Sequence, residues 1–370
     1  MPHHFLKQVP EYDRVKDAQE RYCDLLIIGA GPAGCAAAIE AARGGLKVIL
    51  ADRRQKIGTP AQCAGYLPVL ATQGYEESAG AIINRISGML TFTPDGIVHE
   101  TSAPGFIVNR EIFDQSLSNF AVRTGVELMT ATRAVSRQGC LTTVRTDTGN
   151  LFIRSTLIIG ADGPRSIAGS WIGSINRKFV VGAQWTVTLR QKLEHTRVYF
   201  DERLTGGYGW LFPSGDNANA GVGIDSAVGV KPIEALKWFV GKLAEDGLIR
   251  KKPLMRTGGL ISVGGILNVS RDQVILAGDA AGLCHPVSGA GIANALQSGK
   301  MAGSAAVEFI AKRNLQALKL YAEEIEATFG DSFRNAVAHR RLMYLNEPRT
   351  RKEFSLAVSS GWISRTPASN

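Results

Sequence analysis

The first clear pattern of hydrophobic and polar positions lies between residues 24 and 54. The short apolar run DLLII is followed by an alanine-rich stretch with helical spacing and then by a second apolar run, VILA. Short apolar runs are typical of buried strands, whereas apolar positions repeated every three or four residues are typical of a helix. The segment therefore predicts a strand, a helix and a second strand.

Strand-like and helical patterns alternate along the rest of the chain. Residues 109–124 have helical spacing with Gly125 as a stop, and residues 231–246 read as one helix. Small residues from Gly289 onward predict a helix packed closely on the strand before it. The tail from residue 331 is basic and shows little apolar periodicity. Strand-like patterns occupy four further segments, residues 86–98, 126–163, 179–225 and 273–282.

Length and composition fit a soluble globular protein. A chain of 370 residues favours two connected domains, and 45% hydrophobic with 20% charged residues excludes a largely disordered chain. The longest uncharged stretches are broken by glycine and proline, so no membrane span is predicted. The N-terminus is too polar for a secretory signal, and we therefore expect a cytoplasmic protein.

Cysteine spacing and net charge narrow the choice of partners. The five cysteines are odd in number, widely spaced and free of any C-x-x-C pair, so neither a disulfide framework nor a metal site is predicted. The formal net charge of +9 favours an anionic membrane surface or a diphosphate as partner, unless it serves solubility alone. No basic run alternates with aromatic residues, which argues against nucleic acid.

Gly29, Gly31 and Gly34 form the pattern G-x-G-x-x-G between the first predicted strand and helix. Glycines at this spacing allow a tight turn, the close approach of a pyrophosphate and contact between helix and sheet. The helix N-terminus then faces the phosphates. Asp52 ends the second predicted strand, where an acidic residue accepts hydrogen bonds from ribose hydroxyls. The pattern predicts a dinucleotide cofactor but does not separate NAD from FAD.

Two later segments resemble the second and third flavin-binding motifs of the para-hydroxybenzoate hydroxylase-like class of FAD proteins. They are LIIGADGPRS, residues 157–166, and VILAGDAAGLCHPVSGAGIANAL, residues 274–296. The resemblance implies FAD, with Asp279 on the ribityl chain and backbone N–H groups near residues 289–292 facing the pyrimidine edge of the flavin. NREIFDQSL resembles the arginine-containing helix of the class, which implies that Arg110 lies near the flavin; the alternative is an ordinary surface arginine.

A third segment, GGYGWLFPSGDNANAGVGI, resembles the substrate-cavity signature of the geranylgeranyl reductase family. Tyr208, Trp210 and Phe212 alternate with their neighbours and so share one side of a strand. The resemblance implies that they line an apolar substrate together with Pro213. The alternative is that the three rings form the core of the sheet.

The segment KIGTPAQCAGYLP resembles the part of the same family that carries a cysteine near the flavin, which makes Cys63 the catalytic candidate. Its thiol would act as a polar neighbour, a proton source or a redox-sensitive gate, and the alternative is a small buried side chain. His285 beside the third flavin motif is a second candidate acid, with a turn cap as the alternative. The motifs together imply the cofactor-binding residues Gly29, Gly31, Ala33, Gly34, Asp52, Arg53, Cys63, Ala64, Arg110, Asp162, Gly163, Gly278, Asp279, Gly289, Gly291 and Ile292.

The implied fold is α/β, with a Rossmann-like FAD-binding domain interleaved with an α+β substrate domain on an antiparallel β-sheet, and a C-terminal helical tail. The expected FAD-binding segments are residues 23–80, 101–178 and 258–312. The expected substrate-binding segments are residues 81–100 and 179–257. The ends of the chain, residues 1–22 and 313–370, are expected to form an N-terminal extension and a C-terminal helical region.

The implied activity is FAD-dependent reduction of isolated carbon–carbon double bonds in geranylgeranyl or other polyprenyl chains, on a lipid or a diphosphate. A flavin-dependent monooxygenase shares the FAD motifs, but the Tyr-x-Trp-x-Phe-Pro segment counts against it. A flavin halogenase is disfavoured because Tyr208 and Phe212 replace the Trp and Ile of its motif, and because the loop after Lys56 carries no lysine before Arg85. A flavin electron carrier is the non-enzymatic alternative.

The rest of the sequence bears on two further partners, the electron donor and a membrane. No second G-x-G-x-x-G marks a nicotinamide-binding domain, so the reductant is either NAD(P)H that binds transiently or a small ferredoxin-like protein. The basic tail and a lipid-like substrate together suggest peripheral contact with a membrane.

Overall fold

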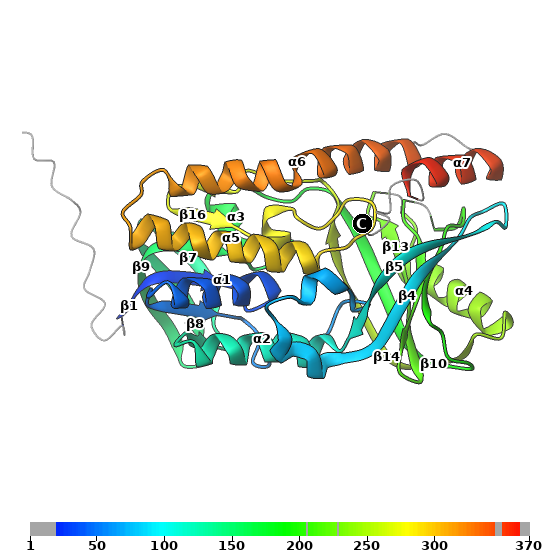
Figure 1. The fold of residues 1–370 in the computed structure, drawn as a ribbon, viewed down its shortest axis with the longest axis horizontal. Helices are drawn as coiled ribbons and strands as arrows, with labels where there is room; N and C mark the ends of the chain where they lie inside the picture. The colour runs from blue at the N-terminus through cyan, green and yellow to red at the C-terminus, as the bar shows by residue number, and fades with distance from the viewer. Residues whose placement is uncertain (1–19, 205, 228, 345–349, 363–370) are drawn as a thin grey trace, which may run out of the picture.

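The computed structural model describes residues 20–204, 206–227, 229–344 and 350–362. These residues form an elongated molecule with one sheet at each end (Figure 1). Helices α1 (Pro32–Arg43) and α5 (Ile292–Ile310) pack on the first sheet, and α4 (Pro232–Glu245) covers the outer face of the second. Helix α6 (Ala317–Met343) runs along both parts and ends beside α7 (Arg351–Gly361).

The first sheet has the strand order β15-β16-β9-β1-β2-β6, and β8 and β7 continue from β9 as antiparallel neighbours. The pairs that β1 makes with β2 and β9 are parallel, as are the β9–β16 and β2–β6 pairs. The strands are β1 (Glu20–Ile28), β2 (Val48–Ala51), β6 (Glu127–Met129), β7 (Arg133–Gln138), β8 (Leu141–Thr146), β9 (Gly149–Gly160), β15 (Ser270–Arg271) and β16 (Val274–Leu276).

The strand, helix and strand predicted over residues 24–54 are confirmed as β1, α1 and β2. Strand β1 starts earlier than expected, because Glu20 already pairs with Phe152 of β9. The helices predicted over residues 109–124 and 231–246 are α2 (Arg110–Arg123) and α4. Short helical elements complete the fold: η1 (Val69–Thr72), η2 (Glu76–Ala81), α3 (Ile167–Trp171) and η3 (Gly278–Ala281).

The second sheet has the strand order β14-β10-β13-β12-β11-β4-β5-β3. It is antiparallel except that β11 pairs with β4 in parallel, which corrects the expectation of a purely antiparallel sheet. These two strands come from distant parts of the chain, so no hairpin forces them to run in opposite directions. The strands are β3 (Tyr66–Pro68), β4 (Ile82–Phe92), β5 (Val98–Val108), β10 (Phe179–Leu189), β11 (His195–Tyr199), β12 (Gly209–Ser214), β13 (Asn217–Asp225) and β14 (Ile249–Ser262).

Strand pairing carries the second sheet past the expected segment boundaries. Strand β5 pairs with β4 as far as Val108, and β14 pairs with β10 as far as Ser262. Residues 101–108 and 258–262 were expected in FAD-binding segments but form strands of the second sheet. The hydrogen-bonded ladder continues through these residues, and the sequence pattern gave no sign of where it ends.

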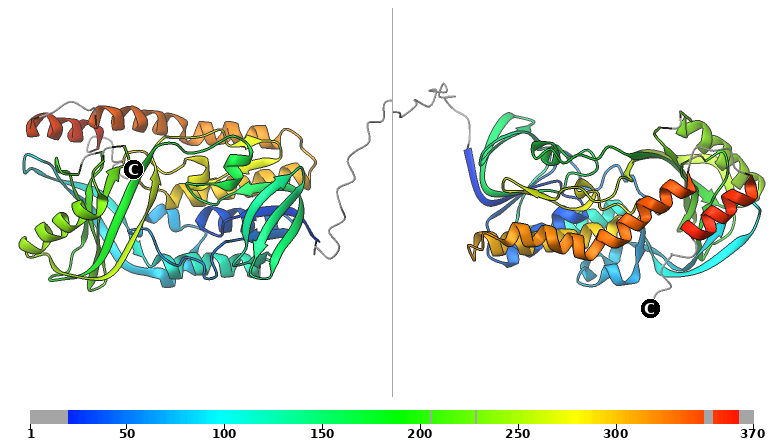
Figure 2. Two further views of the ribbon diagram at one scale, coloured as in Figure 1. Left: turned by 180° about the vertical axis from the view of Figure 1, so that it is seen from behind. Right: turned by 90° about the horizontal axis from the view of Figure 1, so that it is seen from above.

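The expected C-terminal helical tail is confirmed as α6 and α7, but from residue 331 onward α6 is more regularly amphipathic than expected. Its buried positions recur every three or four residues, which is the helical period that the sequence was expected to lack. They are Ala317, Tyr321, Ile325, Phe329, Gly330, Phe333, Ala336, Arg340 and Met343. The first part of α6 packs into the core of the first sheet and its end into a cluster beside the second sheet, so the helix ties the two together (Figure 2).

Candidate functional site

The three glycines of the fingerprint form a turn between β1 and α1, and each has its own steric reason. Gly29 has φ +102°, and a Cβ atom there would lie 2.4 Å from the carbonyl oxygen of Ala161. A Cβ atom at Gly34 would lie 1.8 Å from the carbonyl oxygen of Gly29. Around Gly31 there is open space instead, with no atom within 4 Å. Gly29 and Gly34 therefore close the turn, while Gly31 leaves room for a ligand to approach the backbone.

Helices α1 and α5 lie side by side and run in the same direction. A Cβ atom at Gly299 of α5 would lie 2.2 Å from the carbonyl oxygen of Ala33, and one at Gly303 would lie 2.6 Å from that of Ala37. Both helices start at a glycine, Gly31 for α1 and Gly291 for α5, and neither start has a side-chain cap. Their first N–H groups, including that of Ile292, therefore stay available at one end of the pair, where the helix dipoles favour negative charge.

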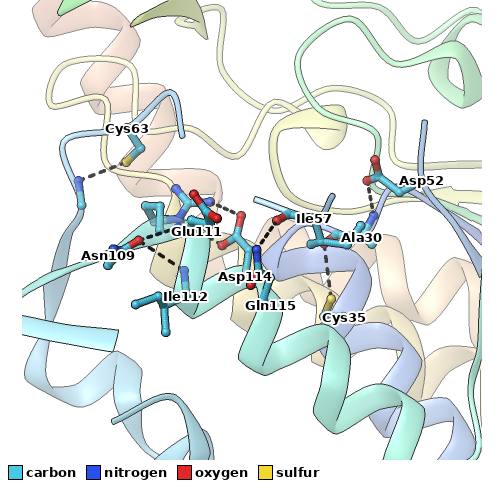
Figure 3. A network of polar contacts seen from close by, with 12 residues as sticks. Ala30, Cys35, Asp52, Ile57, Cys63, Asn109, Glu111, Ile112, Asp114 and Gln115 are labelled. Atoms are coloured by element: carbon cyan, nitrogen blue, oxygen red, sulfur yellow. Dashed lines mark hydrogen bonds and ion pairs between the residues drawn. The ribbon is translucent and has the colours of Figure 1, made fainter. Parts of the chain in front are cut away.

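Asp52 lies at the end of β2 against the glycine turn and is buried. Its Oδ2 accepts a hydrogen bond of 2.8 Å from the Ala30 N–H (Figure 3). Its Oδ1 accepts one of 2.7 Å from the Arg54 N–H. These bonds hold the carboxylate at the turn, where the sequence expected it. The neighbouring Arg53 is exposed.

Asp162, from the second flavin motif, forms hydrogen bonds at the start of α3. Its Oδ2 accepts from the Ile167 N–H at 2.6 Å and its Oδ1 accepts from the hydroxyl of Ser166, which is the N-cap of α3. Burial raises the pKa of Asp162, and these hydrogen bonds oppose the rise. Gly163 follows with φ +85° and open space around it. Asp162, assigned to the cofactor from the motif, therefore also has a structural role at the start of α3.

Asp279, from the third flavin motif, lies in η3 and differs from the other two carboxylates. Its Oδ1 would be 3.3 Å from a Cβ atom on Gly291, and no hydrogen bond from the described residues reaches either carboxylate oxygen. Burial raises the pKa of Asp279, and the charge of Arg110 opposes that rise. Gly278 beside it approaches the α1 start, since its Cβ would lie 2.9 Å from Ala33 Cβ. The carboxylate is an unused acceptor between the two helix starts.

Arg110 occupies the first turn of α2, where Asn109 caps the helix by accepting from the Glu111 and Ile112 N–H groups (Figure 3). Its guanidinium donates to both oxygens of Asp114, at 3.1 and 3.0 Å. Burial alone would lower the pKa of Arg110, but the charges of Asp114 and Cys63 outweigh it and raise the pKa. Arg110 is therefore a half-buried cation fixed by Asp114 rather than a free surface arginine.

Cys63 lies on the loop that passes the start of α2, and its Sγ accepts from the Gly65 N–H at 3.4 Å (Figure 3). The side chain is half-buried rather than fully packed. The next residue, Ala64, accepts through its carbonyl from the Asn219 side chain of β13 at 3.3 Å. This loop therefore joins Arg110 to the second sheet.

Asn176 was not found by sequence reasoning, although it links two flavin motifs. Its Nδ2 donates to the carbonyl oxygens of Pro164 and Asp279, at 3.1 and 3.0 Å. Its Oδ1 is buried and has no hydrogen-bond partner among the described residues. A single asparagine between predicted elements carries no pattern, so nothing in the sequence pointed to it.

The second sheet has two different faces. On the side of α4, Leu211, Val222 and Phe239 are fully buried in one core. On the other side, which we call the aromatic face, Trp210 and Phe212 of β12 and the preceding Tyr208 are only half-buried. Tyr208 and Phe212 pack against a cluster of buried hydrophobic residues that includes Val198 and Phe200, so the core alternative stays open beside the predicted substrate role.

Pro213 does not belong to the aromatic face. Side chains alternate along a strand, and β12 buries Gly209, Leu211 and Pro213 while Trp210 and Phe212 stay half-buried. The expectation that Pro213 lines the substrate together with the three rings is corrected by this alternation.

The aromatic face meets the third flavin motif at Tyr208. Its hydroxyl donates to the carbonyl oxygen of Ser288 and lies 3.6 Å from the Cβ position of Gly289, which has φ +65°. Burial raises the pKa of Tyr208 well above its usual range, so the hydroxyl keeps its proton. Next to it, the Trp210 indole donates to Gln184 Oε1 at 2.9 Å and lies over Gly221, where a Cβ atom would be 2.2 Å away.

His285 forms part of the turn that carries Ser288. Its Nδ1 accepts from the Ser288 N–H at 3.2 Å, and its carbonyl accepts from the Gly289 N–H at 2.9 Å. Burial lowers the pKa of His285, which favours the neutral ring. These contacts agree with the turn cap, the alternative that the sequence left open.

The residues fit an FAD molecule on three observations. Open space at Gly31 lies before an uncapped helix start, which suits a pyrophosphate. Asp279 offers an unused acceptor to hydroxyl groups between the two helix starts. The uncapped start of α5 suits the negative charge of a reduced flavin.

Comparison with known proteins identifies the family. A model of the family described as FAD dependent oxidoreductase matches residues 24–168. Digeranylgeranylglycerophospholipid reductase 3 from Methanosphaera stadtmanae is 33% identical over 372 residues, covering 92% of each chain. The chain belongs to the digeranylgeranylglycerophospholipid reductase family. The reductase of that name from Methanosarcina mazei is 34% identical over 85% of this chain and 81% of its own.

The fold of this family member is also that of a solved structure. A geranylgeranyl bacteriochlorophyll reductase-like protein from Thermoplasma acidophilum has a TM-score of 0.80 at 22% identity, covering 93% of this chain and 97% of that one. These findings confirm the predicted α/β fold, the resemblance to the geranylgeranyl reductases and an FAD-dependent oxidoreductase. Across the described residues, no helix combines the length and apolar character needed to cross a membrane.

Proposed function

We propose that this chain reduces isolated carbon–carbon double bonds in geranylgeranyl chains carried by a glycerophospholipid. The observation that carries the proposal is the aromatic face, where half-buried rings on a middle strand meet the third flavin motif at Tyr208 and Ser288. Apolar rings beside the third flavin motif suit a long, apolar run of isoprene units better than a small polar substrate. The names of the relatives support the same substrate class.

In this proposal the part built on the first sheet binds the cofactor, and the second sheet binds the substrate. FAD supplies the hydride for such a reduction when it is bound. The glycine turn and Asp279 hold it, and the start of α5 stabilises negative charge at the flavin. Tyr208, Trp210 and Phe212 hold the isoprenoid chain and keep water away from a double bond that develops positive charge.

We assign the proton transfer to Cys63, whose Sγ accepts from the Gly65 N–H and interacts with Arg110. These two contacts orient the Cys63 side chain on the loop beside the start of α2. Loss of a positioned proton donor costs roughly 10²- to 10⁴-fold in rate, so Cys63→Ala is expected to slow reduction within this range. Cys140→Ala, at an exposed cysteine on β7–β8, is the matched control and should leave the rate unchanged.

Anaerobic turnover tests the proposal directly. The purified holoprotein is reduced with dithionite, mixed with digeranylgeranylglycerophospholipid, and followed by flavin absorbance and product mass. Reoxidation coupled to a gain of two hydrogens per double bond is expected. A flavin that stays reduced until oxygen enters, with an oxygenated product, would favour the monooxygenase. Reoxidation only by a protein or quinone partner would favour the electron carrier.

The reductant that reloads the flavin is either NAD(P)H or a protein. The sequence holds a single G-x-G-x-x-G, so NAD(P)H would bind transiently, and the alternative donor is a small ferredoxin-like protein. Stopped-flow reduction of the oxidised flavin by NADPH, NADH and reduced ferredoxin separates them, since only a true donor reduces FAD within the turnover time.

Peripheral contact with an anionic membrane completes the proposal, although part of the basic tail is engaged in ion pairs. Within that tail Arg334, Arg340 and Arg351 form ion pairs, and Arg349 lies outside the described residues. Strand β14 carries exposed basic residues that form no ion pair with the described residues, next to the exposed Leu254 and Met255. These basic residues are Arg250, Lys251, Lys252 and Arg256.

Vesicle binding tests this contact. Sedimentation with phosphatidylglycerol vesicles at low salt should recover the protein, and 1 M salt should release it because charge attraction is screened. Lys251→Glu with Lys252→Glu should weaken binding more than Lys352→Glu, the control on α7. A protein that ignores the vesicles would remove membrane contact from the proposal and leave the reductase activity untouched.

A further inference from the structure

Trp362 at the end of α7 contacts the aromatic face from the far end of the chain. The residue is buried, with 5% exposure. Its ring centroid lies 5.1 Å from that of Tyr208 and 5.3 Å from that of Phe200, both in edge-to-face geometry. Its Nε1 donates to the Thr91 hydroxyl of β4 at 3.0 Å. Trp362 is therefore fixed in position by two rings and one hydrogen bond.

Strand register places these contacts on the same side of the sheet as Trp210. Residues that pair across neighbouring strands face the same side. Val198 pairs with both Thr91 and Trp210, and Trp210 pairs with Gly221. One row therefore crosses six strands of the aromatic face in the order Thr91, Val198, Trp210, Gly221, Gln184 and Thr257.

The indoles of Trp362 and Trp210 contact different parts of this row. Trp362 binds Thr91 at the β4 end, whereas Trp210 lies over Gly221 and donates to Gln184 toward the β14 end. Tyr208 lies between the two indoles, 6.1 Å from Trp210 and 5.1 Å from Trp362 by ring centroid. Ring contacts thus run without a break from Trp210 on β12 through Tyr208 to the buried Trp362 after α7.

Helix α7 holds Trp362 there through its own core. Phe354 and Val358 of α7 pack with Val198, Phe200 and Met343 in the same cluster. Thr350 starts the helix with a capping box that involves Glu353. In the β4–β5 turn, the Asp95 N–H donates a hydrogen bond of 3.1 Å to the Ser355 hydroxyl of α7. The helix is thus anchored to α6 and to the sheet, and Trp362 is not a loosely attached end.

We infer that Trp362 is a specificity-determining residue, which closes the β4 end of the aromatic face and limits the length of isoprenoid chain that lies along it. The inference rests on the proposed function. A rigid indole at the end of an apolar surface excludes further isoprene units by its volume, as apolar sites discriminate by fit. Removing it would open the row from Trp210 to Thr91 and let a longer chain extend.

A chain-length competition tests the inference. Wild-type holoprotein and Trp362→Ala are each given glycerophospholipids with farnesyl, geranylgeranyl or geranylfarnesyl chains, and the reduced products are quantified by mass. The variant is expected to raise the ratio of geranylfarnesyl to geranylgeranyl reduction about tenfold, the scale of discrimination by apolar fit. Trp362→Leu, which keeps an apolar side chain of smaller volume, should shift the ratio in the same direction if Trp362→Ala does not fold.

Two control variants separate specificity from stability. Phe354→Ala removes a ring from the same cluster that contacts Phe200 and Tyr344, so it should lower the melting temperature without changing the chain-length ratio. Leu356→Ala, on the exposed side of α7, should change neither. An unchanged ratio in an active Trp362 variant, or an equal shift in Phe354→Ala, overturns the inference. A wild-type protein that reduces none of the three lipids instead overturns the proposed function.

Discussion

The glycine turn and the aromatic face are built in opposite ways. At the glycine turn, missing side chains determine the geometry, since Gly34 leaves no room for a Cβ atom against the Gly29 carbonyl. On the aromatic face, large side chains determine it, and they come from distant parts of the chain: Trp362 binds Thr91 across 271 positions. The turn therefore shows in local spacing, whereas the aromatic face exists only once the whole chain has folded.

The largest expected change in stability comes from replacing Arg340, a residue of α6 that supports the aromatic face. This buried arginine donates to the carbonyl oxygens of Gly206 and Pro286 and pairs with Asp225 at 3.1 Å. Arg340→Met keeps the apolar stem and leaves those acceptors unpaired, so the free energy of unfolding should fall by about 3 kcal/mol. Urea denaturation measures it.

A double-mutant cycle isolates the ion pair within that effect. Asp225→Asn removes the charge on the partner, and the double variant should cost less than the sum of the single variants because the two residues are coupled. Equal stability of Arg340→Met and wild type would show that α6 does not hold the aromatic face in place.

The next largest effect is expected from adding volume where α1 and α5 meet beside the glycine turn. Gly299→Ala places a Cβ atom 2.2 Å from the Ala33 carbonyl oxygen, so α5 must move away from α1. Overpacking of this kind costs roughly 1–3 kcal/mol and should also weaken FAD binding, because the two helix starts shift. Thermal unfolding and the flavin-to-protein ratio measure both.

Gly241 supplies the matched control for that change. It also lies inside a helix, α4, but no atom lies within 4 Å of its Cβ position. Gly241→Ala should therefore raise stability, by up to about 1 kcal/mol, through helix propensity alone. If both substitutions changed the stability in the same direction, close contact between α1 and α5 would not explain why position 299 requires glycine.

These two regions also explain how far the sequence could be interpreted. The spacing of Gly29, Gly31 and Gly34, and the alternation of Tyr208, Trp210 and Phe212, are local, and local patterns predicted the turn, β12 and its two faces. Asn176, Arg340 and Trp362 act through partners far along the chain, and no periodic pattern marks such contacts. The period of α6 was present in the sequence, but its many charged residues obscured it.

A smaller effect is expected at the cofactor itself. Neither carboxylate oxygen of Asp279 accepts a hydrogen bond from the described residues, so Asp279→Ala removes an acceptor that we propose FAD uses. FAD affinity should fall at least tenfold, about 1.4 kcal/mol, with little change in the stability of the apoprotein. The flavin-to-protein ratio after gel filtration measures it, and Asp331→Ala, on the exposed side of α6, is the control. An unchanged flavin content would remove Asp279 from the cofactor site.

The smallest effect concerns the junction of the two regions, where His285 forms the turn that accepts the Tyr208 hydrogen bond. Burial lowers the pKa of His285, so the unfolded chain takes up a proton near pH 6.5 while the folded ring stays neutral. Stability should therefore fall as the pH drops below 6.5, by at most about 1.4 kcal/mol per pH unit until the lower folded pKa is reached. His285→Gln cannot titrate and should flatten this part of the curve in urea denaturation. An identical slope in the variant would mean that other groups cause the acid sensitivity, and that the turn joins the regions through its backbone alone.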